Sequence, residues 1–305
     1  MGTRLMIGNY KFTCRFETQA ILPPIKGSTF RGVFGRALKR VVCALRLQEC
    51  DDCMLREQCL YTTVFEMNTL PHPFVIEPPL TTKTDFSKGD GFDFNLLLFG
   101  PMNEKLPYFI YAFKEMGRVG IGRRVNGQRG NFALQEVKCD YGVIYDAREE
   151  KIILPNLQGT VIPKLGNFTG DKTIIKVNLI TPLRLKYKNH LAPDLPFHVL
   201  IRAALRRLSS LYKAYGEGEP ELDYTGLVRR AEEVNIIQNN ISWFDWRRYS
   251  FRQERAMFMG GLVGSVTYEG DLAPYIPLLD LCQQVHVGKQ TAFGLGKIEV
   301  ETRSR

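Results

Sequence analysis

The spacing of hydrophobic and polar residues predicts the same succession of elements in both halves of the chain. In each half an alternating strand pattern is followed by a helical pattern, further strands, a second helix and a final strand. In the first half these elements lie at residues 10–22, 29–47, 63–67 with 74–79 and 91–100, 106–117 and 118–137. In the second half they lie at residues 173–188, 197–216, 242–270, 271–288 and 289–302. In both halves the last element begins in a glycine-rich loop.

Short stretches of the two halves also match each other. Residues 29–41, TFRGVFGRALKRV, parallel residues 196–208, PFHVLIRAALRRL. The order βαββαβ is that of a ferredoxin-like, or RRM-like, domain, whose antiparallel sheet has strand order 4-1-3-2 and both helices on one face. We therefore predict an α+β protein of two tandem ferredoxin-like domains, residues 1–145 and 146–305. The first contains a cysteine-rich insertion, and the second ends in a C-terminal glycine-rich loop.

This fold has a consequence for three of the four histidines. Strands 1 and 4 are antiparallel neighbours, so the loop after strand 1 and the loop after the second helix should meet at one end of the domain. In the second domain these segments carry His190, His198 at the start of a helix, and His286. We expect these three residues to lie together beside the glycine-rich loop. His72 lies between two prolines, where a turn residue is expected.

Composition restricts the classes of function. The chain has 305 residues, of which 44% are hydrophobic, and a net charge of +9. The hydrophobic fraction is enough for packed cores, and the positive charge favours polyanionic partners. No stretch approaches the ~18 consecutive apolar residues of a membrane span. The first residues lack the apolar core of a signal peptide. We expect a cytoplasmic protein without membrane contact.

Four of the seven cysteines lie close together, in the segment CALRLQECDDCMLREQC. Cys50 and Cys53 form a C-x2-C pair, and Cys43 and Cys59 flank it. Four thiolates can hold a structural zinc ion in tetrahedral geometry, and a reducing cytoplasm favours zinc over disulfides. We expect these four residues to bind a structural zinc ion. The alternative is that they are free cysteines in a helical hairpin.

The stretch HVGKQTAFGLGKIEV, residues 286–300, combines glycines with lysines but does not match a nucleotide-binding loop. A P-loop needs Ser or Thr after Gly-Lys, whereas Gln290 follows here, and this loop precedes a strand instead of a helix. Glycines in a tight turn are one interpretation. We favour the other, in which backbone amides and basic side chains lie along a polyanion. The residues expected to contact the polyanion in this loop are Lys289, Gln290, Thr291, Gly294, Gly296 and Lys297.

Several stretches together resemble a known family. VHVGKQTAFGLGKIEV is similar to the glycine-rich signature of the RAMP superfamily of CRISPR-associated proteins. The stretches FRGVFGRALKRVVC, CLYTTVFE, GFDFNLLLFG and WRRYSFRQERAMFMGGLVGSV resemble, in order, segments of the endoribonucleases that process CRISPR precursor RNA. The resemblance covers nearly the whole chain. It implies two ferredoxin-like domains, RNA cleavage without a metal cofactor and a role in antiviral defence. It also implies CRISPR repeat RNA and other CRISPR-associated proteins as partners.

Metal-independent RNA cleavage requires particular side chains. The neighbouring 2′-hydroxyl is the nucleophile, a base and an acid transfer protons, and a cation stabilises the phosphate. Many relatives place a catalytic histidine on or near the first helix of the first domain, but residues 23–47 contain none. The candidate catalytic residues are therefore His198, His286 and His190. Lys26, Lys39 and Lys289 are candidates for stabilising the phosphate.

Basic residues outside the C-terminal loop are also expected to contact RNA. They are Arg118, Arg123 and Arg124 at the first glycine-rich loop, Arg36, Lys39 and Arg40 on the first helix, and Arg247 and Arg248 in WFDWRRYSFR. Tryptophans beside the last pair could stack on unpaired bases. Two other functions remain open: a non-catalytic RNA-binding subunit of a CRISPR effector complex, and a zinc-containing nucleic-acid-binding scaffold.

Overall fold

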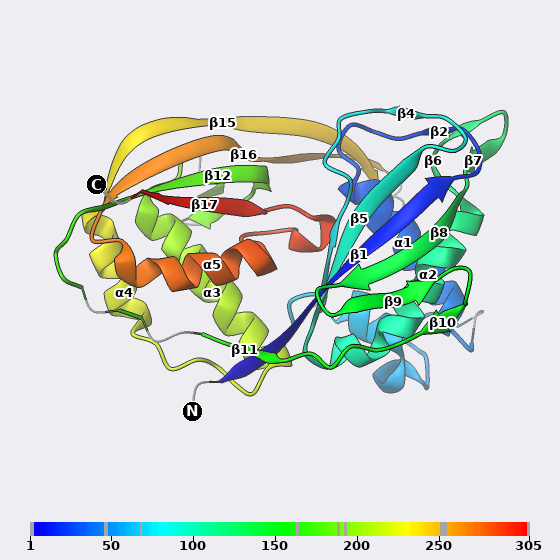
Figure 1. Cartoon of the computed structure of the whole chain (residues 1–305), viewed down its shortest axis with the longest axis horizontal. Coiled ribbons are helices and arrows are strands. Elements are labelled where there is room, and N and C mark those ends of the chain that lie inside the picture. Colours follow the sequence, from blue (N-terminus) through cyan, green and yellow to red (C-terminus); the bar gives the residue numbers. More distant parts are fainter. Residues whose placement is uncertain are drawn as a thin grey trace. The chain divides into compact units, whose positions relative to one another are not determined.

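The computed structural model divides into two compact units (Figure 1), Met6–Gly159 and Met1–Leu5 with Thr160–Arg305. It describes residues 3–45, 48–67, 69–162, 165–166, 168–187, 190–191, 194–250 and 255–303. Residues 146–159 belong to the N-terminal unit, where β10 (Lys151–Ile152) pairs with β9 (Gly142–Asp146). No described helix is long and apolar enough to cross a membrane.

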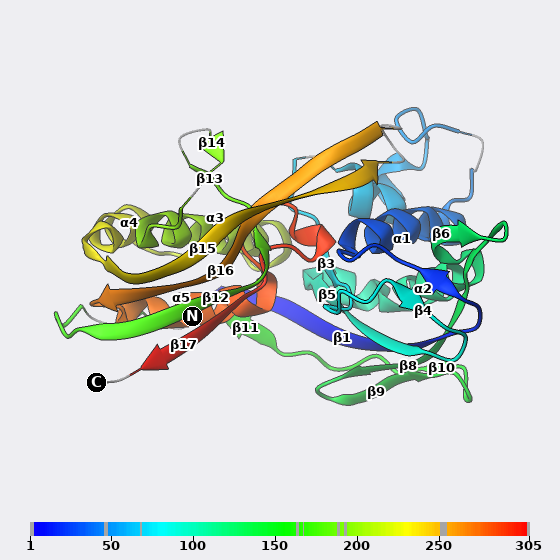
Figure 2. The same ribbon diagram turned by 90° about the horizontal axis from the view of Figure 1, so that it is seen from above.

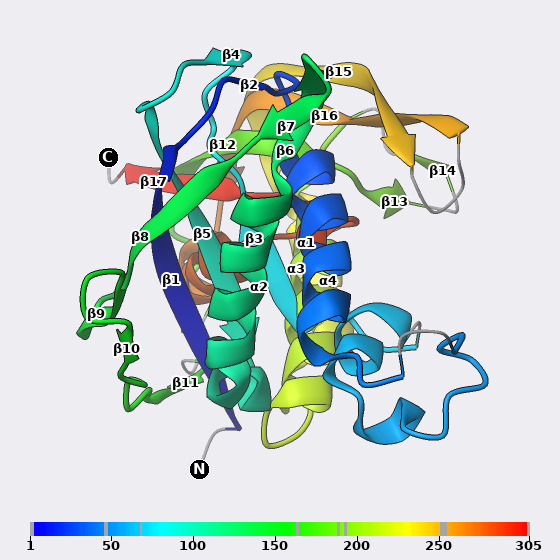
Figure 3. The same ribbon diagram turned by 90° about the vertical axis from the view of Figure 1, so that its right-hand side faces the viewer.

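The N-terminal unit has the predicted ferredoxin-like topology. Its main sheet is formed by β1 (Arg4–Phe16), β3 (Phe74–Glu77), β5 (Gly91–Phe99) and β8 (Phe132–Cys139). Their order is β8-β1-β5-β3, which is 4-1-3-2 counted along the unit. β1 is antiparallel to both β5 and β8. The helices α1 (Gly27–Val42) and α2 (Leu106–Val119) lie side by side on one face of this sheet (Figure 3). The strand order predicted from the hydrophobic pattern is confirmed.

Phenylalanine rings join the two helices to the sheet. The rings of Phe34 on α1 and Phe113 on α2 stack with centroids 4.6 Å apart. Phe113 also lies 4.9 Å from Phe12 on β1 and 4.7 Å from Phe94 on β5. These side chains are almost completely buried, so they contribute much of the apolar area removed from water. The outer faces of α1 and α2, which carry arginines, are thereby placed next to each other.

Short elements complete the N-terminal unit. β2 (Ala20–Ile21), β4 (Asp85–Phe86), β6 (Ile121–Val125) and β7 (Gln128–Gly130) form a small sheet in the order β4-β2-β6-β7. The short helical turns are η1 (Arg56–Gln58), η2 (Thr62–Glu66) and η3 (Gly100–Lys105). The strand predicted at residues 63–67 is wrong, because η2 is a turn of π-helix closed by a hydrogen bond from Met67 N to Thr62 O (3.1 Å). β3 pairs with β5 instead.

The C-terminal unit repeats the topology. Its sheet consists of β12 (Thr173–Leu183), β15 (Asn235–Ser250), β16 (Arg255–Gly270) and β17 (Ile298–Arg303). The order β15-β16-β12-β17 is again 4-1-3-2 read from the other edge. The helices α3 (Phe197–Tyr215) and α5 (Ile276–Val285) lie on one face of the sheet (Figure 1). The remaining elements are β11 (Gly159–Val161), β13 (Lys186–Tyr187), β14 (His190–Leu191), α4 (Tyr224–Arg230), η4 (Ala231–Glu233), η5 (Ala273–Tyr275) and η6 (Thr291–Phe293).

The two longest strands of the C-terminal unit extend beyond their own sheet. β12 pairs with β16 only between Leu262 and Gly270, whereas β15 pairs with β16 as far as Ser250 and Arg255. The rest of β15 and β16 therefore forms a two-stranded ribbon, which projects past the ends of β12 and β17 (Figure 2). We call residues 243–250 and 255–262 the β15–β16 arm.

Candidate nucleic-acid interface

The C-terminal glycine-rich loop is folded tightly against the end of β12. Lys289 N donates to Arg184 O (2.8 Å), and Gly296 N donates to Pro182 O (3.1 Å). Gly296 has φ +74°, and a Cβ atom at this position would lie 1.8 Å from Val287 O. Only glycine fits such a close approach with a left-handed backbone. The glycines therefore shape the loop.

The residues predicted to bind RNA in this loop fall into two groups. Lys289 is exposed, and Gln290 and Lys297 are half-buried. Thr291, Gly294 and Gly296 are buried, so they present little surface to a ligand. The amides of Lys289, Gly294 and Gly296 all donate to protein carbonyls. Because these amides are already bonded, they are not available to a phosphate as predicted, and the lysines at the edges of the loop provide its accessible positive charge.

His286 is part of the loop's internal structure. Its side chain is completely buried, and Nδ1 lies 2.9 Å from Leu295 O. Its φ of +61° is unusual for a residue with a side chain, which indicates that tertiary contacts hold this conformation. A ring without exposed surface does not reach a phosphate, so this geometry assigns His286 to holding the loop.

The predicted meeting of three histidines at one end of the unit does not occur. His198 is the second residue of α3, next to Phe197, whose ring packs 5.1 Å from that of Tyr275 just before α5 begins. His286 follows the other end of α5. A ten-residue helix is about 15 Å long, so the two histidines lie at opposite ends of it. His190 lies in β14, opposite Tyr187, and its side chain lies outside the described residues.

His198 and His286 lie apart because of the connection between β12 and α3. Arg184 contacts the glycine-rich loop as the topology required, but α3 begins only at Phe197. The intervening chain contains the short β13–β14 pair and then Leu195, whose carbonyl accepts a hydrogen bond from the Tyr268 hydroxyl near the end of β16 (2.6 Å). The predicted strand ran to residue 188, which left a shorter connection to the helix than the structure has. A long one lets the helix start at the opposite end of the sheet.

A buried arginine anchors α5, the helix that leads into the loop. Arg207 on α3 donates from Nε and Nη2 to Val285 O, at 3.2 and 2.9 Å. Val285 ends α5, where helix carbonyls lack partners within the helix. Burial lowers the pKa of Arg207 to about 10. Arg207 therefore acts inside the unit and not at its surface.

The β15–β16 arm brings arginines and aromatic rings together. The guanidinium of Arg248 lies 5.1 Å from the ring centroid of Phe293 in the glycine-rich loop. Arg247 lies 5.0 Å from the ring of Phe258, which is 67% exposed. Phe244 and Trp246 stack with centroids 5.8 Å apart. The arm thus offers exposed rings beside exposed positive charge, the combination that binds single-stranded nucleic acid.

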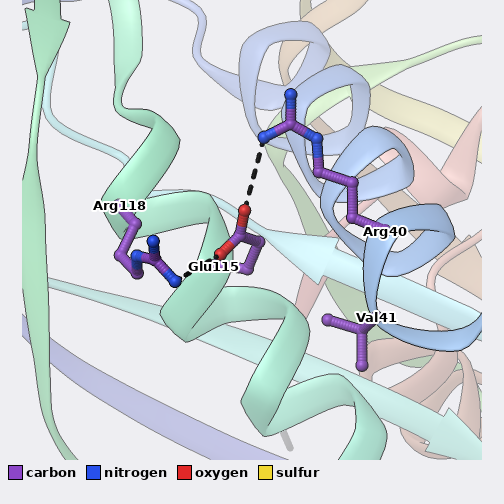
Figure 4. Close-up of a pocket in the computed structure, with 4 residues that line it drawn as sticks. All are labelled: Arg40, Val41, Glu115 and Arg118. Atoms are coloured by element: carbon purple, nitrogen blue, oxygen red, sulfur yellow. Dashed lines mark hydrogen bonds and ion pairs between the residues drawn. The ribbon is translucent and has the colours of Figure 1, made fainter.

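A second basic surface lies on α1 and α2 of the N-terminal unit. Glu115 accepts ion pairs from Arg40 (3.3 Å) and Arg118 (3.4 Å), and with Val41 these residues line a cavity of about 500 Å³ (Figure 4). Partial burial lowers the pKa of Arg36, and the positive charges of Arg129 and Arg40 lower it further. We call Arg36 and Arg40 on α1, Arg118 on α2 and Arg129 on the neighbouring β7 the α1–α2 arginine surface. Mutual repulsion among these cations favours binding of an anion.

The other basic residues predicted in the N-terminal unit have different surroundings. Arg123 and Arg124 are exposed on β6. Lys39 instead faces the cysteine segment, with its ammonium 5.4 Å from the ring of Tyr61. Burial lowers the pKa of Lys39, but a hydrogen bond with Cys50 and nearby charge outweigh this, and the net pKa is raised. Lys26 is buried beside the carbonyls of Pro24 and Thr81, and burial lowers its pKa.

The four clustered cysteines do not form the predicted zinc site. Among the described residues, which include all four, no three histidine, cysteine or acidic side chains are arranged to hold a metal ion. Cys43, Cys50, Cys53 and Cys59 are free and partly exposed. The backbone carbonyl of Cys53 accepts a hydrogen bond from Arg56 N in η1 (2.9 Å), and that of Cys59 accepts one from Thr63 N in η2 (3.0 Å). The side chain of Cys50 contacts Lys39. As arranged here, these residues do not fit a four-thiolate zinc ion.

The two units together define the class of protein. Each is a ferredoxin-like domain in which a glycine-containing segment precedes the last strand, and each carries a basic surface. A family model described as CRISPR-associated endoribonuclease Cas6 matches residues 177–298. A second model, AF_1859_N, described as an N-terminal domain, matches residues 5–157, half of the chain. The chain belongs to the CRISPR-associated Cas6-type RNA-processing proteins, as the resemblance implied.

Individual relatives agree with this assignment. An uncharacterized protein of Archaeoglobus fulgidus is 24% identical over 294 residues, which is 92% of this chain and 93% of that protein. Thermus thermophilus Cas6 has a TM-score of 0.57 and 15% identity, covering 97% of this chain and 99% of that one. A partial Cas6-RT-Cas1–Cas2 complex has a TM-score of 0.58 and 15% identity, covering 100% of this chain and 47% of that one. At these identities the solved structures show the fold.

Proposed function

We propose that this protein is an endoribonuclease that cleaves CRISPR repeat RNA and requires no metal ion. The match of residues 177–298 to the Cas6 endoribonuclease model carries the proposal, because that range includes the glycine-rich loop and the β15–β16 arm. Exposed cations in both units support it, since RNA binding needs positive charge to meet the phosphates. CRISPR-associated proteins are further proposed partners, because a similar fold occurs within a Cas6-RT-Cas1–Cas2 complex.

The proposed reaction is an internal transfer at one phosphate. The 2′-oxygen loses its proton and forms a bond to phosphorus, while the bond from phosphorus to the 5′-oxygen breaks. The 5′-oxygen takes up a proton and leaves as a hydroxyl, and the phosphate remains as a 2′,3′-cyclic diester. Basic side chains would stabilise the charge that develops on the phosphate oxygens.

We propose three groups of RNA contacts. At the glycine-rich loop, Lys289, Gln290, Lys297 and Arg248 would contact the backbone, and Thr291, Gly294 and Gly296 would support the loop from beneath. On the arm, Arg247 would bind phosphate beside rings that stack on bases. In the N-terminal unit the proposed contacts are Arg36, Lys39, Arg40, Arg118, Arg123 and Arg124.

Labelled repeat RNA incubated with purified protein in EDTA tests this function. We expect a single cut that leaves a 2′,3′-cyclic phosphate and a 5′-hydroxyl. A matched RNA with one 2′-deoxy nucleotide at the cut should bind equally well and stay intact, because it lacks the nucleophile. Cleavage only with added Mg²⁺, or cleavage of the deoxy substrate, would contradict the proposal.

A non-catalytic RNA-binding subunit is the second candidate function. The burial of His286 and the separation of His198 from the glycine-rich loop favour it, since the histidines named from the sequence do not form one cluster. Under this alternative the same RNA would be retained tightly and remain uncut. The EDTA experiment separates the two functions, provided that binding and product formation are measured in the same samples.

A further inference from the structure

His72 is held in one orientation against α1 by both of its ring nitrogens. Nδ1 lies 3.1 Å from Val64 O, and Nε2 lies 3.1 Å from the Nη2 atom of Arg31. Arg31 belongs to α1, whereas His72 precedes β3 by a single residue after the chain has passed through the cysteine segment. The turn expected between the two prolines therefore places an imidazole beside the first helix.

These two contacts determine where the ring carries its proton. A backbone carbonyl can only accept a hydrogen bond, so Nδ1 must donate to Val64. A guanidinium can only donate, so Nε2 must accept from Arg31. The imidazole is thus neutral, with its hydrogen on Nδ1 and a lone pair on Nε2. This is the state in which histidine acts as a general base.

The surroundings keep the pair in place and leave it within reach of solvent. Val64 belongs to the π-helical turn η2, whose last carbonyls need partners outside the turn. The Arg31 guanidinium lies 5.1 Å from the ring of Phe65, and the His72 ring lies 5.7 Å from that of Phe74. His72 and Arg31 are both half-buried. By contrast, His286 has no exposed surface.

We propose that His72 is the proton-transfer residue of the cleavage reaction and that Arg31 is its phosphate-binding partner. This inference rests on the proposed function. A phosphate of the RNA would take over the guanidinium of Arg31, which frees the lone pair on Nε2. Nε2 then removes the proton of the 2′-hydroxyl as the 2′-oxygen bonds to phosphorus, and the departing 5′-oxygen takes a proton from water. The hydroxide that results removes the proton from Nε2, which restores the neutral ring.

The contact between Arg31 and His72 would also keep the base inactive until the substrate binds. Before RNA binds, Arg31 covers the basic nitrogen and holds a positive charge 3.1 Å from it. Binding of a phosphate places the scissile group beside the same two side chains. The bound phosphate would thus lie next to both the positive charge of Arg31 and the proton acceptor of His72, as the reaction requires.

Single-turnover cleavage at saturating protein tests the inference. His72→Asn keeps an amide that can donate to Val64 O but has no basic nitrogen. We expect cleavage to slow by about 10²–10⁴-fold with RNA affinity unchanged. Arg31→Lys keeps the charge but loses the planar donor, and should slow cleavage less. Arg148→Ala is the control, because Arg148 is an exposed cation paired with Asp146 in the same unit.

Chemical rescue separates proton transfer from a structural role. His72→Ala leaves space for imidazole, so added imidazole should restore part of the cleavage rate, which a structural defect would not allow. If this variant does not fold, carbethoxylation of the wild-type protein replaces it. Loss of cleavage should then follow modification of His72, located by peptide mapping, and bound RNA should protect the ring.

The outcomes are distinct. Wild-type cleavage in EDTA together with an unchanged rate for His72→Asn would overturn the inference and leave the proposed function standing. Rate loss in His198→Asn with none in His72→Asn would move the proton-transfer role to α3 and equally overturn it. If the wild-type protein binds RNA without cutting, the proposed function fails and the inference fails with it.

Discussion

The two glycine-containing segments differ although the sequence presents them as equivalents. GIGRR in the N-terminal unit begins β6, in the β6–β7 pair that precedes the last strand β8, whereas GLGKI in the C-terminal unit leads directly into the last strand β17. In the first, Arg123 and Arg124 are exposed beyond the glycines. In the second, the glycines and their amides are used inside the loop, and exposed charge is confined to its edges. In both segments glycine is needed because another part of the backbone lies close to it. Whether the segment can bind a polyanion depends instead on the exposure of the neighbouring basic side chains.

The largest effect is expected from removing the close approach in the N-terminal segment. A Cβ atom on Gly122 would lie 2.2 Å from Ile21 O at a φ of +84°. Gly122→Ala should therefore destabilise the unit by about 3 kcal/mol or more. Gly127→Ala is the matched control, because its φ is +81° but its Cβ would meet open space. That variant should cost about 1 kcal/mol. Urea unfolding measures both, and equal losses would mean that backbone conformation alone, and not crowding, requires the glycines.

The C-terminal loop should depend on the buried Arg207, which anchors the end of α5. Arg207→Met leaves Val285 O without its two donors and should lower the free energy of unfolding by about 2 kcal/mol. The exposed neighbour Arg206 serves as control, since Arg206→Met should change stability by less than about 0.5 kcal/mol. A neutral result for Arg207→Met would indicate that apolar packing replaces the buried cation without loss.

Salt dependence of RNA binding compares the edges of the two segments. Lys289→Ala and Arg124→Ala each remove an exposed cation, and each should flatten the plot of log affinity against log salt by about 0.7–1 for one lost phosphate contact. The measurement is a filter-binding titration at several salt concentrations, with Arg148→Ala as control. A change in one variant only would assign RNA binding to one of the two segments.

The smallest effect is expected at the α1–α2 arginine surface. Glu115→Gln removes the carboxylate that holds Arg40 and Arg118, so RNA affinity should rise by about two- to fivefold, as expected for partly exposed ion pairs. Glu104→Gln makes the same change of charge at an exposed site of the same unit. If both variants raise affinity equally, the effect comes from net charge and not from the release of the two arginines.

Much of the fold could be predicted because it depends on local periodicity. The alternating runs became β1 and β12, the helical runs became α1, α2, α3 and α5, and the strand order 4-1-3-2 followed from the succession of elements. The exception, residues 63–67, is a short apolar stretch in which strand and helix patterns cannot be distinguished.

The site was less predictable because it depends on distances between residues far apart in the chain. The sequence by itself determined which side chains are basic, that the loops need glycine, and which family the chain resembles. Only the tertiary structure decided that His286 is buried and that His198 and His286 lie at opposite ends of α5. It decided as well that the four clustered cysteines do not form a metal site. It also decided that His72 meets Arg31, 41 residues away. Periodicity records which face of an element is buried, but not the path of a long connection, and that path sets which side chains meet.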